Sequence, residues 1–119
     1  MSIMYTVYGI KNCNTVKKAL DYLTEKGVEY SFHDYKKAGI TKKKLTDWAS
    51  QIGWEPLINK KGSTWRMLDE ATKNSVTNKK AAFELAETKT SVIKRPLIEL
   101  DGKVIALGFD KDTYDKINW

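Results

Sequence analysis

Hydrophobic and polar positions follow two different periods over the first third of the chain. Residues 3–8 are rich in aromatic and β-branched side chains and end at Gly9, which predicts a strand. Over residues 16–23 the apolar positions recur at i, i+3, i+4 and i+7, which predicts an amphipathic helix that ends at Gly27. Residues 28–33 alternate strictly between apolar and polar, as in a half-buried strand. Strand, helix and strand in this order predict a right-handed parallel βαβ unit.

A helix is predicted after Thr41, whose side chain can cap it, and it ends at Gly53. Its apolar side consists of Leu45, Trp48, Ala49 and Ile52. Residues 54–66 mix Pro, Gly, Asn and Ser with two tryptophans, which predicts a surface loop. Short helices are predicted over 67–73 and 78–88. The middle of the chain is therefore predicted to be a helical insertion.

The last quarter of the chain predicts two short apolar strands joined by Asp101-Gly102, a dipeptide suited to a tight hairpin. Pro96 precedes the first of these strands, where its missing N–H does least harm. Asp110 can cap a terminal helix that contains Tyr114. The complete order predicts an α/β thioredoxin-like fold: a mixed four-stranded sheet with flanking helices and a central helical insertion.

Length and composition favour a single domain over residues 1–119. The chain is 41% hydrophobic and 30% charged, which is typical of a globular protein and not of a disordered one. It contains no apolar run long enough to span a bilayer, so no membrane partner is expected. Its first residues lack the charge pattern of an export signal. With one cysteine, the chain is expected to be cytoplasmic.

The formal net charge of +6 comes from 21 basic and 15 acidic residues, which raises the question of nucleic-acid binding. The lysines are spread along the chain in short clusters, and no predicted helix carries a continuous basic face. We therefore favour a mildly basic solvated surface over attraction to anionic small molecules, and rank nucleic-acid binding last.

Cys13 lies in the polar stretch GIKNCNTVKKA, between the first predicted strand and the first predicted helix. Asn12 or Asn14 is predicted to be the N-cap of that helix. The free N–H groups and the dipole of a helix start stabilise a thiolate, which is the reactive form of cysteine. A free cysteine is often buried and inert, but Cys13 lies in a polar loop and not on the apolar stripe of the predicted helix. We therefore predict that Cys13 is a reactive nucleophile.

Spacing excludes several cysteine chemistries. Val16 stands where a C-x-x-C motif would have its second cysteine, and Ala19 stands where a phosphatase-type loop would have its arginine. One cysteine and one histidine do not make a zinc site. His33 lies on the polar side of a predicted strand and is expected to face solvent, which disfavours it as a general base for Cys13.

The chain has two arginines, Arg66 and Arg95, against nineteen lysines. Guanidinium groups suit oxyanions and carboxylates better than ammonium groups do. Two ordinary surface arginines are the alternative explanation. In the predicted topology, however, the segment before the third strand lies beside the start of the first helix, so Arg95 is expected to approach Cys13.

The chain resembles the arsenate reductase-related family, ArsC/Spx, and in particular its YffB-like branch. The stretches that carry the resemblance are YGIKNCNTVKKAL, FHDYKKAGI, IGWEPLINKKGSTWRMLDE and IKRPLIELDGKVIALGF. The resemblance implies that Cys13 is the nucleophile and forms a mixed disulfide with glutathione, or receives electrons through glutaredoxin. Arg66 and Arg95 match arginines that hold the anion, and Pro96 matches a cis-proline beside the cysteine.

One departure from the family concerns the substrate. Glutathione-coupled arsenate reductases have a further arginine after the last strand, where this chain has Phe109. The resemblance thus favours a glutathione-dependent thiol reductase that acts on a protein or small mixed disulfide. In this hypothesis Asn12 and the helix start stabilise the charge on Cys13, Arg66 and Arg95 bind the anionic groups of glutathione, and an external thiol resolves the intermediate.

Two alternatives stay open. Spx-like relatives act as transcriptional regulators by binding RNA polymerase, and many use a C-x-x-C switch that this chain lacks. An inert relative of the same fold would have a cysteine of ordinary pKa. The enzyme hypothesis is the one that the two matched arginines favour.

Overall fold

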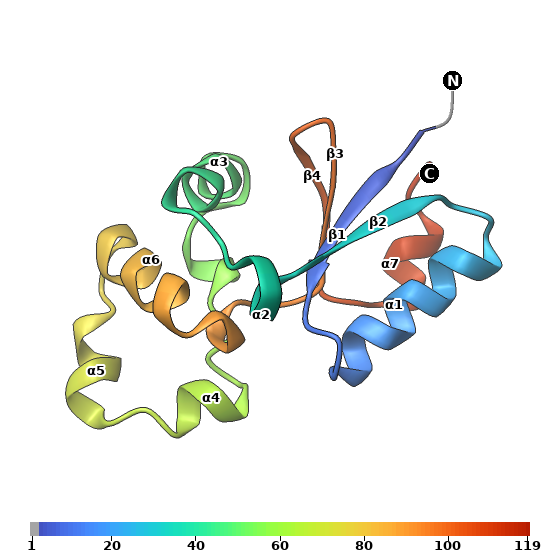
Figure 1. The fold of residues 1–119 in the computed structure, drawn as a ribbon. Helices are drawn as coiled ribbons and strands as arrows, with labels where there is room; N and C mark the ends of the chain where they lie inside the picture. Colours follow the sequence, from blue (N-terminus) through green and yellow to red (C-terminus); the bar gives the residue numbers. More distant parts are fainter. Residues whose placement is uncertain (1–2) are drawn as a thin grey trace. The chain divides into compact units, whose positions relative to one another are not determined.

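The computed structural model describes residues 3–119, which form two compact units (Figure 1). The first unit comprises residues up to 38 together with 95–119, and the second comprises residues 39–94. The second unit is the helical insertion that the sequence predicts. That residues 1–119 form a single domain stays a prediction.

The first unit is built on a mixed four-stranded sheet in the order β2-β1-β3-β4. Strand β1 pairs in parallel with β2 and antiparallel with β3, and β3 pairs antiparallel with β4. The elements of this unit are β1 Tyr5–Gly9, α1 Asn14–Glu25, β2 Tyr30–Asp34, α2 Tyr35–Ala38, β3 Leu97–Leu100, β4 Lys103–Leu107 and α7 Lys111–Asp115. The predicted mixed sheet, with its parallel βαβ opening and its terminal hairpin, is confirmed.

The turn of the β3–β4 hairpin uses the two residues that the sequence indicates. Asp101 has a φ of 51° and Gly102 a φ of 81°, so both lie in the left-handed region. Two consecutive residues with positive φ match the right-handed twist of the flanking strands. Asp110 accepts a hydrogen bond from the backbone N–H of Thr113 and caps α7, as predicted.

The hydrophobic core of the first unit lies on the face of the sheet that α1 and α7 cover (Figure 1). Alternate residues of β1 and β3 contribute to it, because successive side chains of a strand point to opposite faces. The buried members of this core are Tyr5, Val7, Ala19, Tyr22, Leu23, Ile98, Ala106 and Tyr114. The core fixes α1 on the sheet and thereby fixes the loop that precedes this helix.

The second unit is helical. Its elements are α3 Lys42–Ile52, η1 Glu55–Leu57, α4 Ser63–Arg66, α5 Glu70–Ser75, α6 Lys79–Thr88 and η2 Thr90–Val92. Thr41 caps α3 by accepting a hydrogen bond from the Lys44 backbone N–H, as predicted. The helix predicted over 78–88 is observed almost unchanged, whereas that predicted over 67–73 begins later, after its cap Asp69.

The predicted surface loop over residues 54–66 is wrong in part. The segment contains η1 and α4, and both Leu57 and Ile58 are buried. Ile58 forms an isolated antiparallel bridge with Ile93, which ties the segment into the second unit. Helices of three or four residues are too short to display a hydrophobic period, so composition alone indicated a loop.

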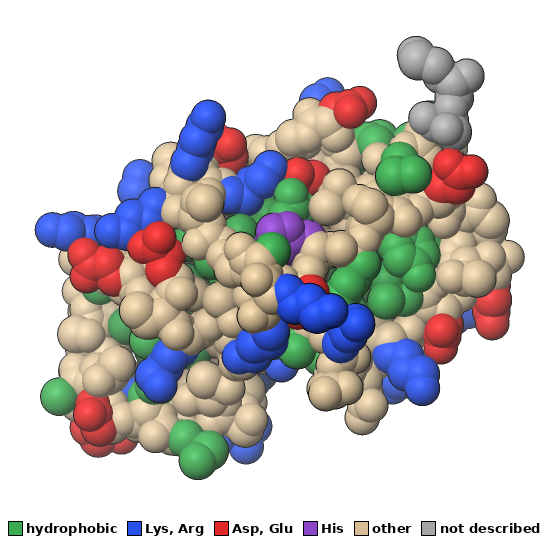
Figure 2. Space-filling model, viewed as in Figure 1, with side chains coloured by type: hydrophobic (Ala, Val, Ile, Leu, Met, Phe, Trp, Pro, Cys, Tyr) green, Lys and Arg blue, Asp and Glu red, His purple; other side chains and the backbone are tan. Residues whose placement is uncertain are grey.

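Charged side chains are distributed over the surface in separate groups. On the face shown in Figure 2, basic side chains occur with acidic ones among them. Within residues 3–119, no helix is both long and apolar enough to cross a membrane.

Candidate active site at the start of helix α1

Cys13 is itself the N-cap residue of α1. Its backbone is extended, with φ −130° and ψ 120°, and its carbonyl accepts the hydrogen bond of the Lys17 N–H at 2.9 Å. The predicted cap, Asn12 or Asn14, is therefore wrong. Asn14 is already the first helical residue and Asn12 lies one position too early, so neither side chain is placed to cap the helix.

The N-cap position brings the Cys13 sulfur to the place where a capping oxygen normally accepts a hydrogen bond. The Cys13 side chain makes no capping hydrogen bond in the structure, as befits a thiol, which is a weak acceptor. The backbone N–H groups of Val16 and Thr15 nevertheless favour the thiolate and lower the pKa of Cys13. These are the second and third residues of the helix, the usual donors to an N-cap side chain.

Opposing effects set the pKa of Cys13, and their sum lowers it. Burial is the largest single effect and raises the pKa, because it disfavours the charged form. The N–H of Val16, the positive charge of Arg95, a hydrogen bond from the Arg95 guanidinium and the N–H of Thr15 together outweigh burial. The result is a half-buried cysteine whose thiolate is stabilised by one helix start and one arginine.

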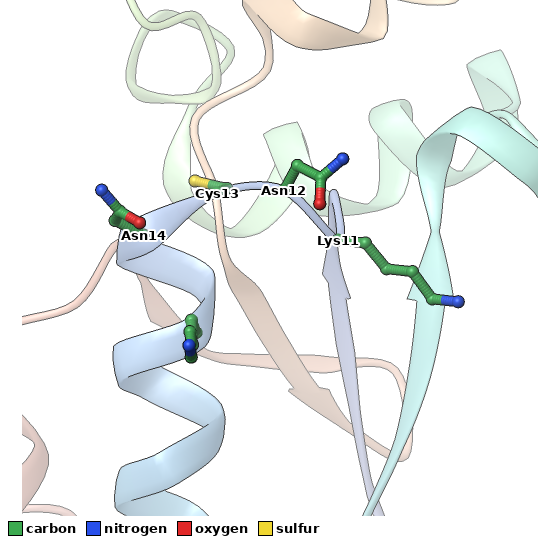
Figure 3. Close-up of a pocket in the computed structure, with 5 residues that line it drawn as sticks. Lys11, Asn12, Cys13 and Asn14 are labelled. Atoms are coloured by element: carbon green, nitrogen blue, oxygen red, sulfur yellow. The ribbon is translucent and has the colours of Figure 1, made fainter.

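Cys13 opens into a polar cavity of about 550 Å³ in the first unit. The other residues that line the cavity are Lys11, Asn12, Asn14 and Lys17. Figure 3 shows the sulfur at the turn before α1, with the side chains of Asn12 and Asn14 directed away from it on either side. Figure 3 shows the Lys11 side chain directed away from the sulfur, so the positive charge of the two lining lysines acts on the surroundings of the cavity, and the helix start is the group that favours an anion at the sulfur.

Arg95 and Pro96 lie in the segment before β3, and Arg95 acts on the Cys13 sulfur through its charge and a hydrogen bond. The Arg95–Pro96 peptide bond is cis, as the sequence resemblance implies. Pro96 is buried, and its carbonyl accepts a hydrogen bond from the Gly108 N–H at 2.7 Å. The sequence thus predicted correctly that Arg95 approaches Cys13.

Arg66 lies in α4, in the second unit, and is exposed. Its Nε donates a hydrogen bond to the backbone carbonyl of Lys61 at 3.1 Å, and its Nη2 donates to the same oxygen. The guanidinium therefore binds a backbone carbonyl of the same segment, five residues earlier in the chain. That Arg66 binds an anion stays a prediction.

His33 does not face solvent as predicted. It is half-buried, and its ring lies 4.7 Å from that of Tyr8 and 5.9 Å from that of Tyr35. Tyr8 is its partner in the parallel β1–β2 register, so the two side chains share a face of the sheet. Strand alternation identified this face correctly, but did not reveal that it is covered.

Sequence reasoning missed a group of buried polar side chains on the face of the sheet opposite α1. Glu99 is only 7% exposed and accepts a hydrogen bond from the Tyr8 hydroxyl at 2.8 Å. Tyr35 is 1% exposed, and its hydroxyl has no hydrogen-bond partner among residues 3–119. One signal was available: Glu99 interrupts the apolar run of β3, and an acidic residue inside a central strand needs a buried partner.

Phe109, which stands where the resemblance expects an arginine, belongs to an aromatic cluster. Its ring centroid lies 4.8 Å from that of Tyr114 and 6.0 Å from that of Tyr22. Phe109 also lines a cavity of about 240 Å³ whose lining shares no residue with the Cys13 cavity. The side chain at this position thus contributes packing and no charge.

A family model described as the ArsC family matches residues 8–117. An uncharacterized protein of Haemophilus influenzae is 49% identical over 111 residues, which are 93% of this chain and 96% of the relative.

Two solved structures are similar along nearly their whole length. A protein named YffB is 44% identical, with a TM-score of 0.85 over 93% of this chain and 96% of its own. An arsenate reductase (ArsC) related protein from Brucella melitensis is 42% identical, with a TM-score of 0.75 over 97% of this chain and 92% of its own. These likenesses support the thioredoxin-like fold and a thiol-reductase kind of function.

Proposed function

The chain belongs to the ArsC family, and from this premise we propose that it is a glutathione-dependent thiol reductase whose single nucleophile is Cys13. The observation that carries the proposal is the position of Cys13. Its sulfur lies at the start of α1 and accepts a hydrogen bond from Arg95, and its pKa is lowered despite partial burial. A thiolate stabilised in this way is the form that attacks disulfides.

The reaction has two exchange steps. The Cys13 thiolate attacks the glutathione sulfur of a mixed disulfide, forms a new S–S bond and displaces the substrate thiolate, which takes a proton from solvent. A second glutathione thiolate then attacks the glutathione sulfur bound to Cys13, which releases oxidised glutathione and regenerates the Cys13 thiolate. One glutathione is thereby oxidised for each substrate reduced. A glutaredoxin thiol can replace the second glutathione.

External thiols are required because Cys13 is the chain's only cysteine. A dithiol enzyme resolves its mixed disulfide with its own second cysteine, and this chain has none. The solitary thiol therefore supports a monothiol mechanism.

The cavity around Cys13 supports glutathione as the co-substrate. Glutathione carries two carboxylates, and Lys11 and Lys17 line the cavity together with Asn12. In this proposal the two lysines attract those carboxylates, and Asn12 offers an amide N–H to the bound peptide. Arg95 stabilises the negative charge that passes from the attacking to the leaving sulfur. Arg66 is proposed as a further carboxylate ligand from α4.

Arsenate is the less favoured substrate. The position that would carry a further anion-binding arginine holds Phe109, whose ring packs against Tyr22 and Tyr114. Loss of one charge-assisted hydrogen bond costs about 1.5–3 kcal/mol in oxyanion binding. We therefore propose disulfides as substrates.

The test is reduction of a small glutathione mixed disulfide, followed by the oxidation of NADPH through added glutathione reductase. The wild-type protein is expected to turn over and to carry one glutathione after incubation with oxidised glutathione, as seen by intact-protein mass spectrometry. Cys13→Ser should lose both properties. Turnover that persists in Cys13→Ser, or a wild-type protein that neither turns over nor forms the adduct, contradicts the proposal. An inactive protein that co-purifies with RNA polymerase would instead support the regulator alternative.

A further inference from the structure

Tyr114 of α7 is almost completely buried in the core of the first unit, yet it carries a polar hydroxyl. The side chain is 1% exposed. Its hydroxyl donates a hydrogen bond to the Gly108 carbonyl oxygen at 2.6 Å. A buried hydroxyl costs free energy unless it is hydrogen-bonded, and a tyrosine differs from a phenylalanine only by this group. The polar atom of Tyr114 is therefore directed at one backbone position, Gly108.

Gly108 connects Tyr114 to the segment before β3. It follows β4, is buried, and has a φ of 80°, which lies in the left-handed region. Its N–H donates a hydrogen bond to the Pro96 carbonyl oxygen at 2.7 Å. This bond extends the pairing of β3 and β4 by one residue beyond Leu97 and Leu107. Two consecutive hydrogen bonds thus join the Tyr114 hydroxyl to Pro96, the residue that follows Arg95.

Pro96 lies at the end of the hairpin that the turn does not fix. The register of β3 and β4 shifts within the hairpin, so a bulge lies between the turn and Pro96. A bulge disrupts the ladder locally and leaves one residue unpaired. The pairing of β3 with β1 extends only to Leu97. The hydrogen bond between Tyr114 and Gly108 therefore adds a support from α7 where the strand pairing ends.

The Tyr114 ring also packs against the helix that begins after Cys13. Helices α1 and α7 cover the same face of the sheet (Figure 1). The ring centroids of Tyr114 and Tyr22 lie 5.4 Å apart with an interplanar angle of 84°, a favourable edge-to-face arrangement. One side chain thus contacts both supports of the site. Its ring contacts α1, and its hydroxyl acts through Gly108 on the segment that contains Arg95.

We propose that Tyr114 is a positioning residue: its hydroxyl holds the segment before β3 in the place from which Arg95 donates a hydrogen bond to the Cys13 sulfur. Tyr114 does not touch the reacting atoms, because its hydroxyl is buried and bonded to Gly108. The groups that favour the thiolate are Arg95 and the first backbone N–H groups of α1. The effect of the Tyr114 hydroxyl therefore passes through Arg95. The inference rests on the proposed use of Cys13 as a nucleophile.

The test measures the rate at which iodoacetamide alkylates Cys13 between pH 4 and pH 10. Because only the thiolate reacts, the midpoint of the rate profile reports the thiol pKa without any need for enzyme turnover. Tyr114→Phe keeps the ring and its contact with α1, and removes only the hydroxyl. The midpoint is expected to rise, and alkylation at pH 6 to slow by about twofold or more, because a displaced Arg95 stabilises the thiolate less.

Tyr22→Phe is the matched control. Tyr22 belongs to the same aromatic cluster and is 7% exposed, but its hydroxyl donates to Asp115 Oδ1 at 2.6 Å and not to the hairpin. Each variant loses one tyrosine hydroxyl with its hydrogen bond, so both should be less stable in urea titrations. The alkylation profile of Tyr22→Phe, however, should equal that of the wild type.

A double variant tests the route. Combining Tyr114→Phe with Arg95→Gln should change the alkylation profile no further than Arg95→Gln alone, because the positioning effect requires the guanidinium.

Circular dichroism at each pH shows whether the variants are folded, and Asp110→Ala decides if Tyr114→Phe is not. Asp110 is exposed and caps α7 by accepting a hydrogen bond from the Thr113 N–H at 3.1 Å. Its loss loosens the helix that contains Tyr114, so the midpoint is expected to rise. Removal of a carboxylate without loosening of the helix would instead lower the thiol pKa or leave it unchanged.

Three results would overturn the inference. An unchanged or lowered midpoint in the deciding variant means that the Tyr114 hydroxyl only satisfies the Gly108 carbonyl. An equal rise in Tyr22→Phe means that any loosening of the aromatic cluster reaches the thiol. Effects of Tyr114→Phe and Arg95→Gln that simply add mean a route other than Arg95. A wild-type protein without glutathione turnover would remove the proposed function but leave this alkylation measurement interpretable.

Discussion

The guanidinium of Arg95 donates a hydrogen bond to the sulfur of Cys13 and places a positive charge beside it. The two residues are far apart in the sequence and meet because β3 lies next to β1 in the sheet. This relationship couples the reactivity of the thiol to a single side chain of the first unit.

Replacement of Arg95 by Gln should raise the thiol pKa of Cys13 toward its ordinary value, because both the charge and the hydrogen bond are lost. Alkylation at pH 7 is expected to slow severalfold, about threefold or more. The thiol pKa and the alkylation rate of Arg95→Lys should lie between those of the wild type and of Arg95→Gln, since an ammonium group keeps the charge but not the planar donor.

Arg66→Gln is the control for the Arg95 variants. Arg66 binds the Lys61 carbonyl of its own loop, so the alkylation profile of Cys13 should not change. If Arg66 binds a carboxylate of glutathione as proposed, the KM for glutathione should rise while the thiol pKa stays constant. A shifted thiol pKa in Arg66→Gln, or an unshifted one in Arg95→Gln, would contradict these roles.

The lowered pKa of Cys13 also makes a prediction about stability. In the unfolded chain the thiol regains its ordinary pKa, so over the interval between the two values the unfolded state binds more protons. The stabilisation from Cys13 is therefore complete above the ordinary pKa and is lost as the pH falls through the lowered one. In urea titrations the free energy of unfolding of the wild type, relative to Cys13→Ser, should rise between pH 5 and pH 9.

When Cys13→Ala replaces Cys13→Ser as the reference, the difference in the free energy of unfolding should show the same trend with pH, because neither replacement ionises in this range. The other titratable groups are common to all three proteins and cancel in the difference. A difference that stays flat with pH would mean that the thiol pKa is the same in the folded and unfolded chain.

The sequence predicted the parts of the fold in which local preference and tertiary packing agree. The periods around α1, the caps Thr41 and Asp110, and the Asp101-Gly102 turn all operate over a few residues, and each is observed. Arg95 was predicted beside Cys13 because topology alone brings the segment before β3 to the start of α1.

The errors arose where distant contacts decide the outcome. Leu57 is buried in a segment whose composition indicated an exposed loop. Glu99 was not singled out at all, since its buried partner Tyr8 lies on a neighbouring strand, 91 residues away along the chain. The cap of α1 was missed because both asparagines flank the true N-cap, and cysteine is not among the usual capping residues.

Trp119 is expected to contribute to the stability of the first unit. Its ring lies 5.3 Å from that of Tyr5 and 5.5 Å from that of Tyr114, and its indole Nε1 donates a hydrogen bond to the Tyr114 carbonyl at 3.1 Å. Trp119→Ala should lower the free energy of unfolding by about 2 kcal/mol, and Trp119→Phe by about 1 kcal/mol, since phenylalanine keeps most of the ring contact. Urea titration measures both.

Met67 provides the control for this change, because it is 86% exposed. Met67→Ala should alter the free energy of unfolding by less than about 0.5 kcal/mol. A Trp119→Ala protein that falls within the range of this control would show that the aromatic contacts contribute little.

Gly9 ends β1, and the space beside it determines how closely α1 approaches the sheet. A Cβ at this position would lie 2.9 Å from Val16 Cγ2 and 3.2 Å from Val16 Cγ1, so Gly9→Ala requires the Val16 side chain, and with it the first turn of α1, to shift. The expected cost is about 1–3 kcal/mol in the free energy of unfolding. Because the Val16 N–H stabilises the Cys13 thiolate, alkylation at neutral pH should slow as well.

Val16→Ala removes both methyl groups that clash, so the double variant should lose less stability than the sum of the single variants, as urea titration would measure. Strict additivity would show that the clash is relieved elsewhere and that Gly9 does not position the active-site loop.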